Sequence, residues 1–245
     1  MSAQLFTPLK IREIEFRNRI FVSPMCQYSA NDGVVGEWHH SHLGSRAVGG
    51  AGLVMVEATG VSPEGRITPH CVGLWNEQQA AALKPIVEFM KGQGARTGIQ
   101  LAHAGRKAST EVPWRGGKKI GLEQGGWTVV APSAVAFEAD YPMPQALSED
   151  GIHKVIADFV ASAKLAKEIG FEVIELHMAH GYLLHQFLSP LSNQRKDQYG
   201  GSLQNRLRLP LQVAQAVRKE WPEELPLFVR ISATDWVDGG WDVDQ

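Results

Sequence analysis

The chain has 245 residues, of which 44% are hydrophobic and 20% are charged, and its formal net charge at pH 7 is −2. This composition is typical of a soluble globular protein, and it offers no electrostatic case for nucleic acid or an anionic membrane as the main partner. No apolar run approaches the roughly 20 residues of a membrane span. Residues 1–6 lack the basic and apolar regions of a secretion signal. With only two cysteines, Cys26 and Cys71, we expect no disulfide framework and a cytoplasmic location.

Short, nearly continuous apolar runs predict five strands that are buried on both faces of a parallel sheet. In chain order, these strands cover residues 20–26, 51–59, 97–103, 171–177 and 225–232. Apolar residues at helical spacing predict helices between them, over residues 79–91, 149–169 and 202–220. Ser148 is the expected N-cap of the second of these helices and Gly170 its expected C-terminal stop. Residues 38–42, with their three histidines, are expected to open a further helix rather than to bind a metal.

The alternation of strands and helices predicts an α/β fold and favours a TIM (β/α)8 barrel. A closed barrel of this kind has eight strands, so the five predicted strands correspond to only about the first five β/α units. We therefore expect residues 1–245 to be the N-terminal part of a single barrel domain, completed by a longer protein or by another polypeptide. Residues 108–147 are too long for a plain connection and are predicted to form an excursion over the site.

The fourth predicted strand ends in three side chains that point to chemistry: His177, His180 and Tyr182. Together they can bind a substrate oxygen and deliver a proton to a neighbouring atom. A buried core has little use for such groups, because each needs a hydrogen-bond partner. Two alternatives stay open, namely that the histidines satisfy loop carbonyls or that His-x-x-His binds a metal. No further ligand stands at an obvious spacing, so we assign no metal site.

In a barrel the active site lies at the C-terminal ends of the strands, where polar residues of several strands meet. Gln100 and Arg230 lie within apolar strands, where an amide or a guanidinium requires polar or anionic partners. Cys26 has a plainer interpretation as a small buried residue. Arg106 and Lys107 also have a plainer interpretation, as solvated charges of a loop.

Eight short motifs follow one another along the chain. They are Arg17-Asn-Arg19, Ser23-Pro-Met-Cys-Gln-Tyr28, Glu57-Ala-Thr59, Gly65-Arg66, Gln100-Leu-Ala-His-Ala-Gly-Arg106, His177-Met-Ala-His-Gly-Tyr182, Asn193-Gln-Arg195 and Asp197-Gln-Tyr-Gly-Gly-Ser202. In this combination the sequence resembles the old yellow enzyme family of flavin-dependent ene-reductases. The cysteine of the second motif places it nearer the bacterial thermophilic-like branch, which includes xenobiotic reductases.

The resemblance implies non-covalent FMN at the mouth of the barrel. Gln100 is implied to bind the pyrimidine edge of the flavin. Arg230 is implied to lie by its N1–C2 carbonyl region, where a cation stabilises the reduced ring. Cys26 is implied to tune the flavin potential without acting as a covalent nucleophile. The full set of implied FMN-binding residues is Ser23, Pro24, Met25, Cys26, Ala58, Gln100 and Arg230.

The resemblance also implies an NAD(P)H oxidoreductase that reduces the activated C=C bond of α,β-unsaturated carbonyl or nitro compounds. NADPH or NADH is the implied reductant, and hydride passes from flavin N5 to the β-carbon. His177 and His180 are implied to bind the substrate oxygen, and Tyr182 to protonate the α-carbon. Tyr28 and Lys107 complete the implied substrate-binding set. The full-length protein is implied to be a homo-oligomer.

Three other interpretations stay open. The chain could be a truncated, non-catalytic half-barrel that needs a partner segment to bind FMN, since phosphate in such barrels is bound after strands seven and eight. The second is the related group of dienoyl-CoA and trimethylamine dehydrogenases, which carry an iron–sulfur cluster. The two cysteines of this sequence cannot ligate a cluster, but a C-terminal continuation of the barrel could hold further cysteines. A metal-dependent hydrolase on the same scaffold is the third.

Overall fold

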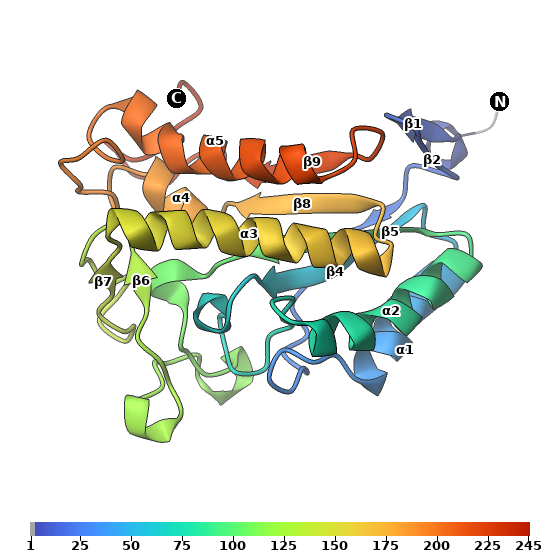
Figure 1. Ribbon diagram of the computed structural model, residues 1–245, viewed down its shortest axis with the longest axis horizontal. Coiled ribbons are helices and arrows are strands. Elements are labelled where there is room, and N and C mark those ends of the chain that lie inside the picture. The colour runs from blue at the N-terminus through green and yellow to red at the C-terminus, as the bar shows by residue number, and fades with distance from the viewer. Residues whose placement is uncertain (1–2) are drawn as a thin grey trace.

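A computed structural model of the chain describes residues 3–245. Met1 and Ser2, which belong to the predicted domain and to the N-terminal segment considered above, lie outside the described residues. Five parallel strands form the central sheet, each paired with the next along the chain. Their C-terminal ends therefore lie at one edge of the sheet (Figure 1). In sheet order, the strands are β3 (Phe21–Val22), β4 (Leu53–Gly60), β5 (Arg96–Ala102), β8 (Val173–Met178) and β9 (Leu227–Ile231).

Helices follow four of these strands and pack on the sheet, as Figure 1 shows for α3 (Glu149–Ile169) and α5 (Leu203–Glu220). Apolar side chains of the helices and strands, among them Ile99, Leu101 and Phe159, form one large buried core. This is the arrangement of the first β/α units of a (β/α)8 barrel. Among residues 3–245, no helix combines the length and apolarity needed to cross a membrane. The helices are α1 (Glu37–Val48), α2 (Glu77–Gly92), α3 (Glu149–Ile169), α4 (Leu183–Leu188) and α5 (Leu203–Glu220).

An antiparallel hairpin of β1 (Leu9–Ile11) and β2 (Ile14–Phe16) lies at the opposite end of the sheet from the loops that follow β5 and β8 (Figure 1). Its Phe16 is fully buried and packs in a second apolar cluster with Leu53, Met55 and Val173. A two-stranded parallel pair, β6 (Val130–Ala131) with β7 (Gln145–Ala146), lies within the long excursion after β5. Neither pair was predicted, because segments this short carry no readable alternation.

The helix ends follow from capping. Helix α3 has the predicted bounds: the Ser148 hydroxyl accepts the N–H of Gly151 at 3.1 Å, and Gly170 ends the helix in the left-handed conformation. The prediction for α2 started two residues late. Asn76 is its N-cap and accepts the N–H of Gln79 at 3.0 Å, so the first turn begins at Glu77. Helix α4 was missed, since its six residues are too few for a periodic pattern.

The first strand was predicted over residues 20–26, and this was wrong, since β3 has only two residues. Pro24 has no N–H to give to a sheet. Beyond it, the N–H of Gln27 donates to the Glu57 carboxylate at 3.0 Å instead of to a strand. The chain therefore leaves the sheet early and carries residues 23–28 across the strand ends.

Arg17 and Asn18 join the hairpin to the ends of two helices. The Arg17 guanidinium donates to the carbonyl oxygens of Ala47 and Gln93, both at 2.9 Å, which lie at the C-terminal ends of α1 and α2. The Asn18 amide donates to the Gly50 carbonyl at 2.8 Å. A cation at helix C-termini is stabilising, so this motif has a structural role.

We expect Gly52→Ala to lower the free energy of unfolding by about 1–3 kcal/mol, the usual cost of overpacking. A Cβ at Gly52 would lie 2.4 Å from the backbone oxygen of Asn18. Gly92→Ala is the matched control, because nothing lies within 4 Å of its added Cβ and alanine favours the helix. Urea unfolding of both variants measures the difference, and equal midpoints would contradict the packing described here.

Candidate active site

Three aromatic rings meet at the C-terminal end of β8, as predicted. The ring centroid of His177 lies 4.9 Å from that of Tyr182 and 5.0 Å from that of His180. All three pairs are edge-on, with His180 and Tyr182 6.5 Å apart. His177 is buried at the end of the strand, whereas His180 is exposed in the turn after it.

His177 is a neutral hydrogen-bond donor. Its Nδ1 accepts the N–H of Ala179 at 3.3 Å, so the proton of the neutral ring lies on Nε2. Burial, reinforced by the charges of His180 and Arg230, lowers the pKa of His177 to about 3. An Nε2–H group that stays neutral and is held by the backbone is suited to bind a carbonyl or nitro oxygen.

Tyr182 keeps its phenolic proton. Burial, followed by the charges of the ionised forms of Cys26 and Tyr28, raises the pKa of Tyr182 above its ordinary value. The Lys107 ammonium lies 5.3 Å from the centroid of the Tyr182 ring and donates to the backbone oxygen of His180 at 3.1 Å. Lys107 therefore belongs to the site, where it holds the turn between the two histidines and the tyrosine.

Gln100 and Arg230 meet at a residue that the sequence analysis missed, Glu175. One carboxylate oxygen of Glu175 accepts from Gln100 Nε2 at 2.6 Å and from Arg230 Nε at 2.8 Å. The Glu175 side chain is only 11% exposed. The signal was present, because a glutamate two residues before His177 in an apolar strand shares the face of His177. It is the anion that the buried part of Arg230 requires.

Residues 23–28 form an edge over the end of the sheet that is largely apolar. Met25 is 51% exposed there, and Pro24 and Cys26 are half-buried. Burial, with smaller contributions from Cys71 and Glu57, raises the pKa of the Cys26 thiol. A thiol kept neutral in this way is a poor nucleophile, which agrees with the predicted non-covalent role. Ala58 lies buried in β4.

Residues 108–147 cover this end of the sheet, as predicted. They line a cavity of about 420 Å³ together with Tyr28, Lys107 and Tyr182. Arg106 ties the excursion down by donating to the carbonyl oxygens of Val135 and Ala136, at 3.2 and 3.3 Å. Besides β6 and β7, the excursion contains the short 3-10 turns Pro113–Arg115 and Leu122–Gln124.

Other motif residues make structural contacts. The Arg66 guanidinium lies between the rings of Trp75 and Trp127, 5.3 and 5.2 Å from their centroids. Arg195 pairs with Asp197 and donates to the Leu147 carbonyl. Within residues 3–245, no group of three or more His, Cys, Asp or Glu side chains is arranged to hold a metal ion.

Comparison with known proteins identifies relatives over almost the whole chain. The sequence model described as the NADH:flavin oxidoreductase / NADH oxidase family matches residues 4–244. An NADH:flavin oxidoreductase of Gibberella zeae is 52% identical over 241 residues, which are 97% of this chain and 58% of that protein. An NADPH dehydrogenase of Bacillus subtilis is 43% identical over 245 residues, which are 99% of this chain and 68% of that protein. The chain thus spans only part of the length of these relatives.

Solved structures agree with this result. Morphinone reductase superposes with a TM-score of 0.85 and 33% identity, over 97% of this chain and 64% of its own. Morphinone reductase in complex with tetrahydroNAD gives the same TM-score at 32% identity, over 98% of this chain and 67% of its own.

We expect the ring C–H resonances of His177 to stay unchanged between pH 8 and 5 in an NMR titration. Burial lowers the folded-state pKa to about 3, so the neutral ring persists through this range. In urea, the same ring is expected to titrate near the ordinary histidine value of about 6.5. The unfolded chain then takes up a proton that the folded chain excludes, so His177 makes the fold less stable as the pH falls below about 6.5. A titration midpoint near 6.5 in the folded protein would contradict this assignment.

Proposed function

Because this chain belongs to the NADH:flavin oxidoreductase / NADH oxidase family, the old yellow enzyme family, we propose that it acts in FMN-dependent reduction of activated C=C bonds. NADPH or NADH is the proposed reductant, and an α,β-unsaturated carbonyl or nitro compound the proposed substrate. The observation that carries the proposal is the neutral Nε2–H donor of His177 beside a protonated Tyr182. The homo-oligomer and the cytoplasmic location stay predictions.

The chemistry of the strand ends fits a flavin. Among residues 3–245, the only hydrogen bond of the Arg230 side chain is from Nε to Glu175, which leaves its two terminal nitrogens to bind the ring. A cation there stabilises the negative charge of a reduced flavin. Gln100 offers an amide to the pyrimidine edge, and the exposed Met25 and half-buried Pro24 offer apolar surface to the ring. The proposed FMN contacts of Ser23, Cys26 and Ala58 complete this edge.

A bound flavin would supply the hydride that reduces the β-carbon of the substrate, with NAD(P)H as its source. His177 donates from Nε2 to the substrate oxygen, and the exposed His180 approaches the same oxygen from the turn. These donors withdraw electron density from the conjugated C=C bond, which favours hydride addition. The proton on the Tyr182 hydroxyl then passes to the α-carbon.

The cavity under the excursion supports a small-molecule substrate. Tyr28, Tyr141 and Tyr182 line it with aromatic surface, and its charged residues are of both signs, with Lys107 and Lys118 beside Glu111, Glu138 and Asp140. A planar, conjugated compound matches the aromatic part of this lining. Tyr28 is therefore proposed to contact the substrate.

A second candidate function is a non-catalytic half-barrel that binds FMN only with a partner segment. One observation favours it: among the described residues β9 pairs with a strand on one side only, and its Val229 and Ile231 are 47% and 57% exposed. A groove of about 410 Å³ lies beside it, lined mostly by apolar residues that include Leu211 and Val243. A further strand with its helix would cover both the edge and the groove.

The two candidates differ in the visible spectrum of the purified chain mixed with FMN. The leading proposal predicts protein-bound flavin that bleaches when NADPH is added without oxygen, because the strand ends offer a cation and an amide to the ring. The half-barrel predicts that residues 1–245 alone hold no FMN tightly, because the phosphate-binding loops of such barrels follow strands seven and eight. Dithionite is the control, because it reduces bound flavin chemically and shows that the flavin can be reduced without NADPH. A protein that retains no FMN after gel filtration would contradict the leading proposal and favour the half-barrel.

Tyr182→Phe is expected to slow reoxidation of the reduced flavin by 2-cyclohexenone by about 10²-fold or more, the usual contribution of a general acid. Flavin reduction by NADPH is expected to change little, because that half-reaction needs no proton from Tyr182. Tyr141→Phe, in the same cavity, is the matched control. Stopped-flow absorbance separates the half-reactions, and an equal loss in both would remove the proton-donor role.

A further inference from the structure

The turn between the substrate-binding side chains has an unusual backbone. His180 and Gly181 are consecutive residues in the left-handed region, with φ of +58° and +71°. A histidine adopts this conformation at a cost in free energy, and such residues persist only where the surrounding structure holds them. Because His180 is the first residue of the turn and Tyr182 follows it, the turn sets the relative directions of two proposed substrate contacts.

Side chains hold all four backbone polar groups of this turn. Two hydrogen bonds come from the proposed site and from the segment after β9: Lys107 donates to the His180 carbonyl at 3.1 Å, and the His180 N–H donates to the Ser232 hydroxyl at 2.9 Å. The other two come from α4: the Gly181 N–H donates to Nδ1 of His185 at 2.8 Å, and Gln186 donates to the Gly181 carbonyl at 2.7 Å. The turn is therefore held from three directions.

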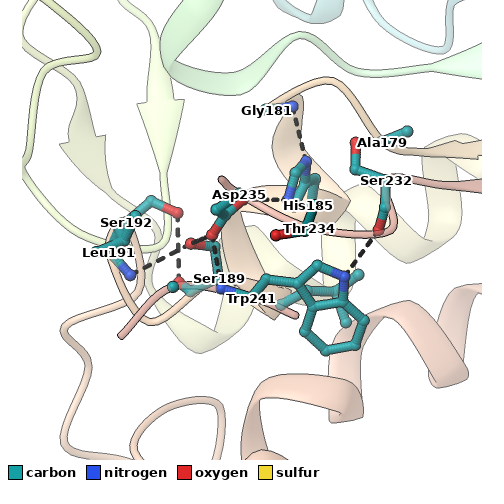
Figure 2. A network of polar contacts seen from close by, with 12 residues as sticks. Ala179, Gly181, His185, Ser189, Leu191, Ser192, Ser232, Thr234, Asp235 and Trp241 are labelled. Atoms are coloured by element: carbon teal, nitrogen blue, oxygen red, sulfur yellow. Dashed lines mark hydrogen bonds and ion pairs between the residues drawn. The ribbon is translucent and has the colours of Figure 1, made fainter. Parts of the chain in front are cut away.

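His185 can accept from Gly181 only in one tautomer, and Asp235 selects that tautomer. With Nδ1 as acceptor, the ring proton lies on Nε2, which faces Oδ1 of Asp235 at 2.9 Å (Figure 2). The other carboxylate oxygen of Asp235, Oδ2, accepts from the Ser189 hydroxyl at 2.5 Å and from the backbone N–H of Trp241 at 2.8 Å. Both side chains are nearly buried, at 7% and 12% exposure. Because an Nδ1 that accepts a hydrogen bond carries no proton, the ring is neutral. Burial favours this form by lowering the pKa of His185, although Asp235 opposes the shift.

We propose that His185, oriented by Asp235, is a positioning residue that holds the His180–Gly181 turn in the geometry that brings His177, His180 and Tyr182 onto one substrate oxygen. This inference rests on the proposed function, since that function makes these three side chains substrate contacts. His185 does not touch the substrate; it acts through the N–H of Gly181. Asp235 couples the segment after β9 to the end of β8.

The competing role is purely structural, in which His185 only fastens the segment after β9 to α4 through Asp235. Two replacements separate the roles, because each reproduces one side of the imidazole. His185→Asn places an amide oxygen near the position of Nδ1 and keeps the acceptor for Gly181. His185→Gln places its amide near the position of Nε2 and keeps the partner for Asp235. Ser192→Ala is the matched control, since the Ser192 hydroxyl donates to the Gln186 and Ser189 carbonyls and, within residues 3–245, makes no hydrogen bond to His180 or Gly181.

The first readout needs no cofactor: hydrogen exchange of the Gly181 amide, measured by NMR in the whole chain. Losing one hydrogen bond corresponds to about a tenfold change. We expect His185→Gln to speed exchange by about tenfold or more, and His185→Asn and Ser192→Ala to stay within about threefold of the unmodified chain. The second readout is the affinity for 4-hydroxybenzaldehyde in FMN-loaded protein, where the same order of variants is expected.

The outcomes are distinct. Fast exchange in His185→Asn with normal exchange in His185→Gln would overturn the proposal in favour of the fastening role, and so would normal exchange in both. If the variants do not fold, the ¹⁵N shifts of His185 in the unmodified chain decide, because protonated Nδ1 with bare Nε2 contradicts the proposal. Exchange as expected with no binding of 4-hydroxybenzaldehyde by the unmodified FMN-loaded protein would instead count against the proposed function and leave the positioning role standing.

Discussion

The buried carboxylate of Glu175 is the constraint around which the site is built. A carboxylate at 11% exposure is costly unless its oxygens are paired. Its partners come from both neighbouring strands, Gln100 of β5 and Arg230 of β9. The three strands are thereby held in the register that pairs Gln100 with Glu175 and His177 with Arg230. The Glu175 carboxylate, which holds this register, also orients the Gln100 amide and the Arg230 guanidinium that are proposed to bind FMN.

Beyond Glu175, the side chains of the site are held mainly by hydrogen bonds to backbone groups, and less by contacts with one another. The tautomer of His177 follows from the N–H of Ala179, and the turn beyond it is held through its own peptide groups. Lys107 had a plain interpretation as a surface charge, yet it bonds to the His180 carbonyl. A reactive geometry built in this way tolerates burial, because the backbone groups of the turn and the Nδ1 atoms of His177 and His185 all have partners.

Local sequence patterns were enough to predict many of the secondary-structure elements and the position of the candidate site. Nearly continuous apolar runs predicted the last four strands of the sheet, and apolar residues at helical spacing predicted the long helices. The bounds of α3 were predicted because Ser148 and Gly170 signal its two ends. His177, His180 and Tyr182 stood out because one strand end carries all three. The first strand failed, since an apolar run says nothing about where a chain leaves a sheet. The failure came at Pro24, where the loop turns to meet Glu57.

The sequence by itself determined the order of elements, the end of the sheet where chemistry gathers, the family and the residue types available there. These depend on spacing along the chain, which can be read directly. Only the tertiary structure decided that Arg230 and Gln100 share Glu175, that His185 supports the turn and that Asp235 orients it. Asp235 lies 50 residues from His185 along the chain. A hydrogen bond depends on distance and angle in space, and no local pattern specifies those across such a separation.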